Sequence, residues 1–229
     1  FVRQDSIRGI PTPITSSGER MLYLTLTIDV DPDANRAIPG RVETRSHPHD
    51  RIYVEACRRG LHKVAGILES QGLPAPFFWE ARTLRILSTT DPTLIRKLAR
   101  CDSFEHGCHG LRHEDFSGQQ TGIKPCPQYV RETLQTATME LNEILGIRPL
   151  GFRAPYCRAT PELKVALAEL NYEYDASETR CPGTDWDMRP DRMTVSGENR
   201  NIWEVPLTLW KRQKGESVSG YLWQLLEGN

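Results

Sequence analysis

FEHGCHGLRHEDF, which runs from Phe104 to Phe116, places a short apolar segment directly before a cluster of polar groups. Its first residues have the composition of a buried strand. Beyond them, His109 and His113 stand four residues apart, and Gly107 and Gly110 give the backbone freedom to bend sharply. Such a pair at the end of a strand indicates either a metal-binding motif or a polar loop, and the surrounding sequence decides between the two.

Strands and helices alternate on both sides of this motif. Apolar runs typical of strands span residues 21–31, 75–79, 103–108, 149–156, 172–177 and 201–209. Helical spacing of apolar residues marks residues 52–70, 91–100, 128–146 and 160–170, and a last helix begins in residues 219–229. This order predicts parallel β/α units, and therefore an α/β sheet or barrel. We expect an irregular arm over residues 1–20 and a single domain over residues 21–229.

The composition argues against several classes of partner. The 29 Lys and Arg residues are balanced by 30 Asp and Glu residues, so there is no basic excess for nucleic acid or a membrane surface. The longest apolar runs are too short to cross a bilayer. The six cysteines are dispersed without a C-x-x-C pair, and no leader follows Phe1. These features favour reduced thiols and a cytoplasmic location.

Polar residues that can do chemistry stand where the predicted strands end. Functional groups gather at these ends in parallel β/α folds. The residues are Asp29 and Asp31, His109 and His113, Arg153, and Asp175. Each of them alone could be an ordinary turn, cap or loop residue. Their occurrence at successive strand ends makes a functional site the better interpretation.

Two imidazoles and one carboxylate form an open three-ligand site for zinc or a similar divalent ion, with room left for water. The four-residue spacing predicts that His109 and His113 lie on one side of a helical turn. Asp29 and Asp31 are expected to point to the same face of their strand, with Val30 on the opposite face. One aspartate could then bind the ion while the other takes a proton from water.

The motifs TIDVD (residues 27–31), APFFW, EHGCHGLRHEDF, FRAPY and YDAS occur in this order. The chain thereby resembles the NodB-homology polysaccharide deacetylases, carbohydrate esterase family 4, from about Leu22 to Leu209. Its DVD and HGLRH motifs are similar to those of the branch with some peptidoglycan deacetylases and cyclic-imide or allantoinase-like hydrolases. The resemblance implies an irregular (β/α) barrel with fewer units than the standard eight. It also implies hydrolysis of an acetamide on a sugar, supported by one divalent ion, zinc before cobalt, nickel or manganese.

The resemblance implies a role for most of the strand-end residues. Asp29 matches the family's catalytic base, and Arg153 matches the arginine that orients this base. Asp31, His109 and His113 match the three metal ligands.

Four further residues receive less direct assignments. Asp175 matches the acid that pairs with the arginine, and Asp185, in an Asp-Trp pair with Trp186, is a rival for this role. Tyr156 lies where a backbone N–H helps to hold the tetrahedral oxyanion. Trp186 is also a candidate for stacking on a sugar ring.

One part of the family pattern is missing. The family usually ends in a Leu-x-His segment whose histidine acts as general acid, and this sequence has no histidine after His113. Three explanations stay open: a barrel truncated at its C-terminal end, another proton donor, or a relative that hydrolyses poorly. His47 and His49 are weaker candidates for the donor. A truncated barrel would expose a strand edge, so homo-oligomer formation is a further hypothesis.

Three functions therefore remain open from the sequence. The first is a metal-dependent deacetylase that removes N-acetyl groups from an amino-sugar-containing carbohydrate. The second is a cyclic-imide or allantoinase-like amidohydrolase, in which the loop 32–50 would form a lid over a small substrate. The third is a catalytically impaired relative that binds carbohydrate.

Overall fold

The computed structural model describes residues 25–32, 37–43, 51–180, 189–195, 198–208, 210–211 and 217–218. The predicted arm over residues 1–20 and the predicted last helix over residues 219–229 lie outside this part of the chain. Asp185, Trp186, His47 and His49 also lie outside it, together with most of the loop proposed as a lid.

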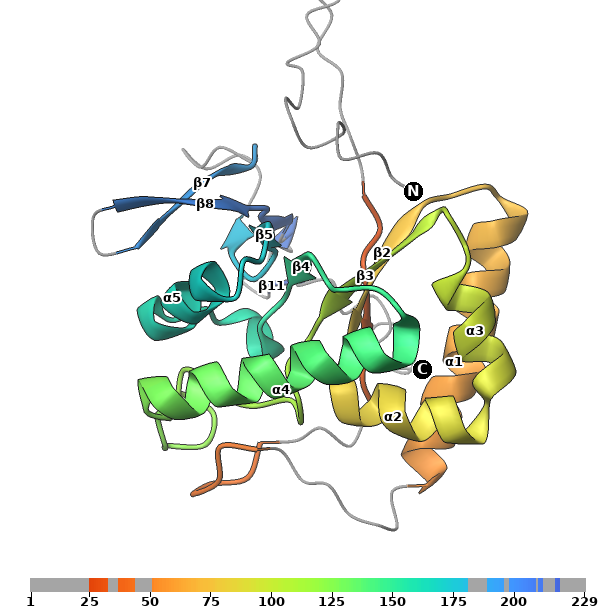
Figure 1. The fold of residues 1–229 in the computed structure, drawn as a ribbon, viewed down its shortest axis with the longest axis horizontal. Coiled ribbons are helices and arrows are strands. Elements are labelled where there is room, and N and C mark those ends of the chain that lie inside the picture. The colour runs from red at the N-terminus through yellow and green to blue at the C-terminus, as the bar shows by residue number, and fades with distance from the viewer. Residues whose placement is uncertain are drawn as a thin grey trace, which may run out of the picture.

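A seven-stranded sheet forms the centre of the structure (Figure 1), with its strands in the order β1-β2-β3-β4-β5-β8-β7. The bounds are β1 Ile28–Val30, β2 Ala75–Trp79, β3 Phe104–Cys108, β4 Gly151–Phe152, β5 Tyr174–Asp175, β8 Glu198–Glu204 and β7 Asp191–Val195. Neighbouring strands from β1 to β8 pair in parallel, whereas β7 pairs with β8 antiparallel. The predicted parallel β/α arrangement is confirmed, and the β7–β8 hairpin is an addition that the sequence pattern did not predict.

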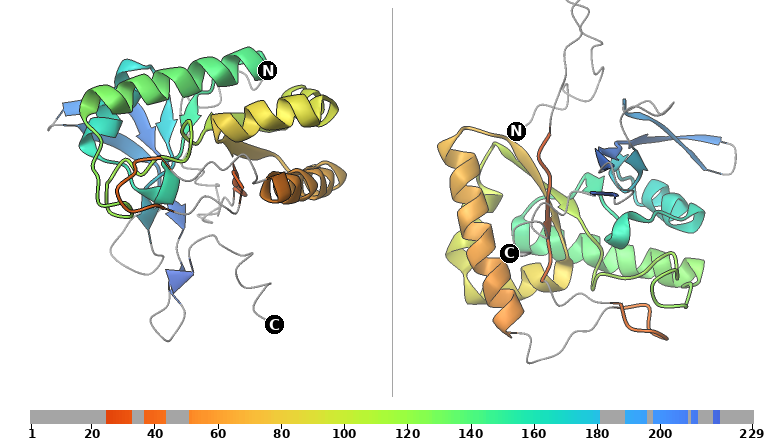
Figure 2. Two further views of the ribbon diagram at one scale, coloured as in Figure 1. Left: turned by 90° about the horizontal axis from the view of Figure 1, so that it is seen from below. Right: turned by 180° about the vertical axis from the view of Figure 1, so that it is seen from behind.

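The helices pack around the outside of the curved sheet (Figure 2). Their bounds are α1 Arg51–Ser70, α2 Ala81–Thr90, α3 Pro92–Ala99, α4 Pro127–Leu145 and α5 Pro161–Glu169, with a 3-10 turn, η1, at Pro155–Cys157. Figure 1 shows α1, α2 and α3 grouped at one end, α5 at the other, and α4 running between them. Two small pairs complete the described strands: β6 (Thr179–Arg180) with β9 (Leu207–Thr208), and β10 (Trp210–Lys211) with β11 (Ser217–Val218).

Side chains of β2 alternate between the two faces of the sheet, as expected for a strand. Phe77 and Trp79 are fully buried in the apolar core that the helices share. Phe78 lies on the other face, where a Cβ atom at Gly107 would come within 2.6 Å of its ring. Gly107 therefore makes room for this ring inside β3, which corrects the prediction that it bends the backbone.

Helix α3 begins where the sequence predicts, because the Asp91 side chain accepts a hydrogen bond from a first-turn amide at 3.1 Å. Helix α2 is not among the predicted elements, and no side chain caps its start. Its first amides, Ala81 N and Arg82 N, donate instead to Gly110 O at 3.0 Å and to Leu111 O at 3.1 Å. A tertiary contact thus replaces the cap and joins α2 to the loop that carries the two histidines.

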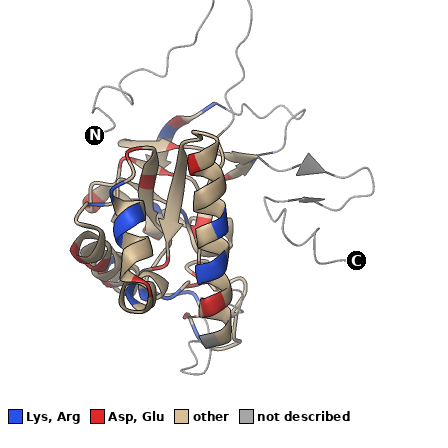
Figure 3. Ribbon diagram, turned by 90° about the vertical axis from the view of Figure 1, so that its right-hand side faces the viewer, with Lys and Arg blue, Asp and Glu red and all other residues tan. Residues whose placement is uncertain are grey.

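The helices on one side of the molecule contain both basic and acidic residues (Figure 3). Figure 3 shows basic and acidic residues interspersed on the helices of that side. No helix in the described part of the chain is long and apolar enough to cross a membrane.

His106 is a structural histidine of the core. Its side chain accepts a hydrogen bond at Nδ1 from Trp79 Nε1 at 2.9 Å, and its Nε2 donates to Leu98 O at 3.2 Å. Burial lowers the pKa of His106 from 6.5 to about 4. The ring is therefore neutral in the folded protein at neutral pH.

We expect the protein to lose stability as the pH falls from 6.5 to about 4, because only the unfolded chain takes up a proton on His106 there. At about 1.4 kcal/mol for each pH unit, the loss approaches about 3 kcal/mol. His106→Gln removes this titration and should flatten that part of the stability curve, measured by urea unfolding at stepped pH. Parallel curves for wild type and variant would contradict the assignment.

Candidate metal centre

Asp31, His109 and His113 come together at the carboxyl end of the sheet. Asp31 follows β1 and the two histidines follow β3, and β2 lies between these strands. One potential ligand atom from each residue lies within 4.8 Å of those of the other two. His113 Nε2 is 3.1 Å from Asp31 Oδ2, and the centres of the two imidazole rings are 5.2 Å apart. The structure therefore gathers the three predicted ligands at one place.

His109 makes the kind of hydrogen bond that is usual for histidine ligands of metal ions. Its Nδ1–H donates to the carbonyl oxygen of Arg153 at 2.9 Å, which leaves the lone pair on Nε2. Bonds of this kind fix the tautomer and the ring orientation of histidine ligands. Burial lowers the pKa of His109, so the ring is held in the neutral form that a ligand needs.

His113 has a different electrostatic environment. Burial alone would lower its pKa, but the carboxylates of Asp31, Glu80 and Glu114 raise the pKa overall. His113 Nδ1 is buried and has no hydrogen-bond partner among the described residues. The surroundings therefore favour a positive charge at this ring, whether a proton or a metal cation provides it.

The loop between the two histidines is irregular, which corrects the prediction of a helical turn. Gly110 has a φ of 84° and His113 has a φ of 53°. These positive values turn the chain back tightly, and only glycine adopts them without strain. The two imidazoles therefore meet at an angle of 68° between their planes, although no helix brings them together.

Asp29 is paired with Arg153 beside the three ligands. Arg153 Nη1 donates to Asp29 Oδ1 at 2.8 Å and to Thr27 Oγ1 at 2.9 Å. Its Nε donates to Ala176 O at 3.0 Å, and its guanidinium carbon lies 4.3 Å from the centre of the Phe78 ring. The Arg153 side chain is 3% exposed and the Asp29 side chain is 34% exposed. A fixed arginine thus holds a carboxylate that solvent can reach.

Asp175 lies near Arg153, but its carboxylate bonds elsewhere. Ser177 Oγ donates to Asp175 Oδ1 and accepts the Ala154 N–H at 2.7 Å. Asp175 is in register with Phe152, so it faces the side of the sheet opposite to that of Arg153. Burial raises the pKa of Asp175 to about 8, and the Arg153 charge partly offsets this rise. Ser177 is therefore the hydrogen-bonding partner of Asp175 among the described residues, and the pairing of Asp175 with Arg153 stays a prediction.

Tyr156 lies in η1, three residues after Arg153 in the segment that follows β4. Tyr156 and Cys157 have φ values of 60° and 52°, which side chains other than glycine rarely adopt. The Tyr156 ring meets the His113 ring edge to face, with 4.8 Å between the centres. Backbone strain of this kind is typical of functional sites. The oxyanion role of Tyr156 stays a prediction, as does the role of Trp186.

Two buried carboxylates stand beside the ligands and were not selected from the sequence. Glu80 follows β2, and its Oε1 pairs with Arg82 Nη2 at 3.1 Å. Glu114 directly follows His113. Burial raises the pKa of Glu80, and it raises the pKa of Glu114 to about 7. Their positions in the sequence, at the end of a strand and next to a predicted ligand, are the signals that could have revealed them.

The donor set fits a divalent cation. Two imidazole nitrogens and one carboxylate oxygen are the ligands of open zinc sites, and nickel and cobalt accept the same set. His109 already has its ring fixed by a second hydrogen bond, and the field at His113 favours positive charge. The residues present are therefore compatible with the metal that the sequence predicts.

The solved structures that resemble this chain include two with the same fold. A Mycobacterium smegmatis protein classed as a polysaccharide deacetylase has a TM-score of 0.56 and 23% identity, over 80% of this chain and 57% of that one. Puue allantoinase has a TM-score of 0.55 and 18% identity, over 81% of this chain and 61% of that one. The chain thus spans less than two thirds of either protein. The predicted barrel type of the deacetylases is confirmed.

Comparison of the sequence with family profiles assigns the chain to a family. No curated protein sequence matches this chain. The sequence profile described as polysaccharide deacetylase matches residues 50–174, which is more than half of the 229 residues. This segment includes β2, β3, β4 and the loop with both histidines. The chain therefore belongs to the polysaccharide deacetylase family.

Proposed function

We propose that the protein is a metal-dependent hydrolase that removes N-acetyl groups from an amino-sugar-containing carbohydrate. The observation that carries the proposal is the position of Asp29, a partly exposed carboxylate held by Arg153 beside the group Asp31, His109 and His113. Hydrolysis of an amide needs both an activated water and a base to take its proton. Membership of the polysaccharide deacetylase family supports the carbohydrate substrate.

Asp31, His109 and His113 would hold the divalent ion, with zinc as the first candidate. When bound, such an ion supplies Lewis-acid polarisation of the amide carbonyl and lowers the pKa of the water nucleophile toward neutrality. Asp29 takes the proton of this water at the carboxylate oxygen that Arg153 does not hold, since Oδ1 accepts the arginine N–H.

Arg153 serves the reaction in two ways. Its side chain holds the Asp29 carboxylate in place, and its carbonyl oxygen fixes the His109 ring. The backbone N–H of Tyr156 would donate to the oxygen that becomes negative as water adds to the acyl carbon. The C–N bond then breaks, acetate leaves, and the proton that Asp29 took from the water passes to the sugar amine.

Acetate release is the direct test of this function. Chelator-treated protein would be assayed on chitin oligosaccharides and peptidoglycan fragments, before and after zinc is restored. We expect acetate and free amine in equal amounts, and only when zinc is present. An O-acetylated sugar is the control substrate, because loss of acetate from it would indicate ester rather than amide hydrolysis.

The D-x-D spacing of Asp29 and Asp31 favours a second candidate, an amidohydrolase acting on a small cyclic amide. Allantoin and a cyclic imide would therefore be assayed beside the sugars. Turnover of either without acetate release would replace the first proposal with the second. Saturable sugar binding without hydrolysis, in protein that retains zinc, would point instead to a carbohydrate-binding relative.

A further inference from the structure

Glu114 is a buried acid that directly follows the loop between His109 and His113. The proposed reaction does not use it. Its side chain is fully buried, and it directly follows the ligand His113. Leu111 N donates to Glu114 Oε2 at 3.0 Å, and Arg112 N donates to Glu114 Oε1 at 2.7 Å. Each oxygen of the carboxylate thus holds one amide of the three-residue span that joins His109 to His113.

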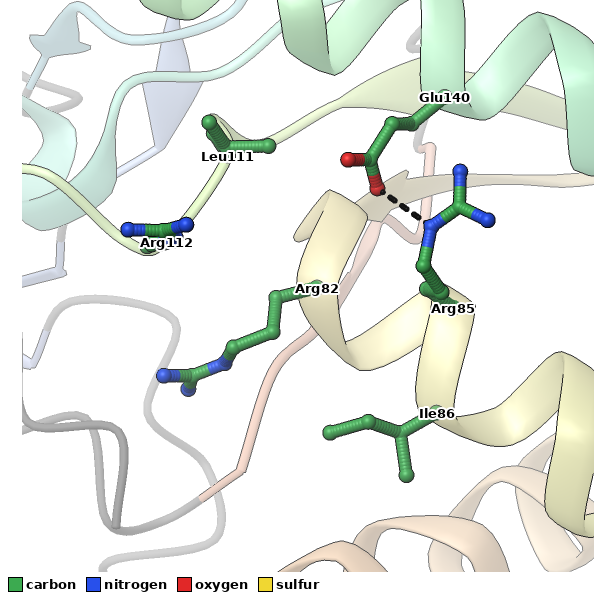
Figure 4. Close-up of a pocket in the computed structure, with 6 residues that line it drawn as sticks. All are labelled: Arg82, Arg85, Ile86, Leu111, Arg112 and Glu140. Carbon is green, nitrogen blue, oxygen red and sulfur yellow. Dashed lines mark hydrogen bonds and ion pairs between the residues drawn. The ribbon is translucent and has the colours of Figure 1, made fainter. Parts of the chain in front are cut away.

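The carbonyl groups of the same span are held from the other side. Gly110 O and Leu111 O accept the first two amides of α2, at 3.0 and 3.1 Å. The side chains of Leu111 and Arg112 line a pocket with residues of α2 and α4 (Figure 4). The span is therefore hydrogen-bonded on both sides, to the carboxylate of Glu114 and to the first amides of α2.

Both the backbone conformation and the small size of Gly110 suit the close approach of the Glu114 carboxylate. Its φ of 84° disfavours any other residue, and a Cβ atom at this position would lie 2.7 Å from Glu114 Oε2. The carboxylate therefore packs directly against the backbone of the span. A larger residue at position 110 would have to displace it.

We propose that Glu114 is a positioning residue, whose carboxylate holds the amides of Leu111 and Arg112 and thereby sets His109 and His113 at the separation that a divalent cation needs. This inference rests on the metal site proposed above. Without the carboxylate, two amides of the span lose their acceptors, and cation binding must restore the arrangement of the ligands. Loss of a supporting group of this kind lowers metal affinity by about 10- to 100-fold.

Cobalt(II) binding tests the proposal, measured by calorimetry and by the visible absorption of the bound ion. We expect Glu114→Ala to bind cobalt about 10- to 100-fold more weakly than wild type and with a changed spectrum. Glu114→Gln keeps one of the two accepting oxygens and turns an NH2 group toward the second amide, so it should recover part of the affinity that Glu114→Ala loses. This partial rescue separates positioning from the charge, which glutamine lacks.

Asp115→Ala is the matched control. The Asp115 carboxylate accepts hydrogen bonds from Gly118 N at 3.0 Å and from Gln120 N at 2.7 Å. These amides follow His113 in the chain, so they lie outside the span between the two histidines. The control should lower thermal stability while cobalt affinity stays within about threefold of wild type, because the span between the ligands is intact.

Each outcome has a distinct meaning. Wild-type affinity in Glu114→Ala would overturn the proposal and leave the metal site in place. An equal loss in Glu114→Ala and Asp115→Ala would also overturn it, because general stability of the loop would explain both. A wild-type protein that binds no cobalt would remove the metal site and both proposals with it.

If Glu114→Ala does not fold, Gly110→Ala provides a second test, because its Cβ atom crowds the same carboxylate. This variant should bind cobalt as weakly as expected for Glu114→Ala, and wild-type cobalt affinity in it would overturn the proposal.

Discussion

Asp29→Asn is expected to lower kcat/KM for deacetylation by about 100- to 10,000-fold, the usual contribution of a general base. The amide has the shape of the carboxylate and can still accept the Arg153 N–H, but it cannot take a proton from water. Asp29 is not part of the three-residue ligand group, so the metal content should stay at the wild-type level. Steady-state kinetics and elemental analysis of the same preparation measure both.

Asp31→Asn is the matched control, because the two aspartates stand two residues apart on the same strand end. This variant should lose metal as well as activity. Loss of metal in Asp29→Asn, or a fall in its kcat/KM of less than about tenfold, would contradict the assignment of Asp29 as the base.

Arg153→Lys is expected to lower kcat by about 100-fold with a smaller change in KM, because misplacing a catalytic group by about 1 Å has an effect of this size. Lysine keeps the positive charge but cannot bond Asp29, Thr27 and Ala176 O at once, as the guanidinium does. The flat stacking on Phe78 is also lost.

Arg180→Lys controls for the general effect of replacing a buried arginine. Arg180 is 7% exposed and pairs with Glu178 and Asp191, at 3.0 and 3.1 Å, without contacting Asp29. Urea unfolding should show both variants destabilised, whereas only Arg153→Lys should lose activity. A kcat near the wild-type value in Arg153→Lys would show that the arginine does not orient the base.

The predictable parts of the fold are those that depend on short stretches of sequence. Residues 75–79 form β2 because the run is apolar, and α3 starts at Pro92 because Asp91 caps it. Helix α2 was not predicted, since its first amides are satisfied by carbonyl groups of the loop between His109 and His113, about thirty residues away in the chain. The hairpin β7–β8 was also not predicted, because the β7 sequence, DRMTV, is largely polar.

The same distinction holds for the site. Asp31, His109 and His113 could be selected because the carboxyl ends of the strands of a parallel sheet lie at the same edge of the sheet. The role of Glu114 could not, because it depends on a loop whose positive φ values no sequence pattern specifies. The direction of Asp175 is a matter of strand register, and a motif match does not give the face that a side chain occupies.

Metal stoichiometry tests the central claim most directly. Metal-free protein would be reloaded with zinc, desalted and analysed for zinc per chain, together with Asp31→Ala and His113→Ala. The account predicts about one ion per wild-type chain, and loss of tightly held zinc in both variants. Wild-type protein without zinc, or zinc binding that is indifferent to both substitutions, would contradict it.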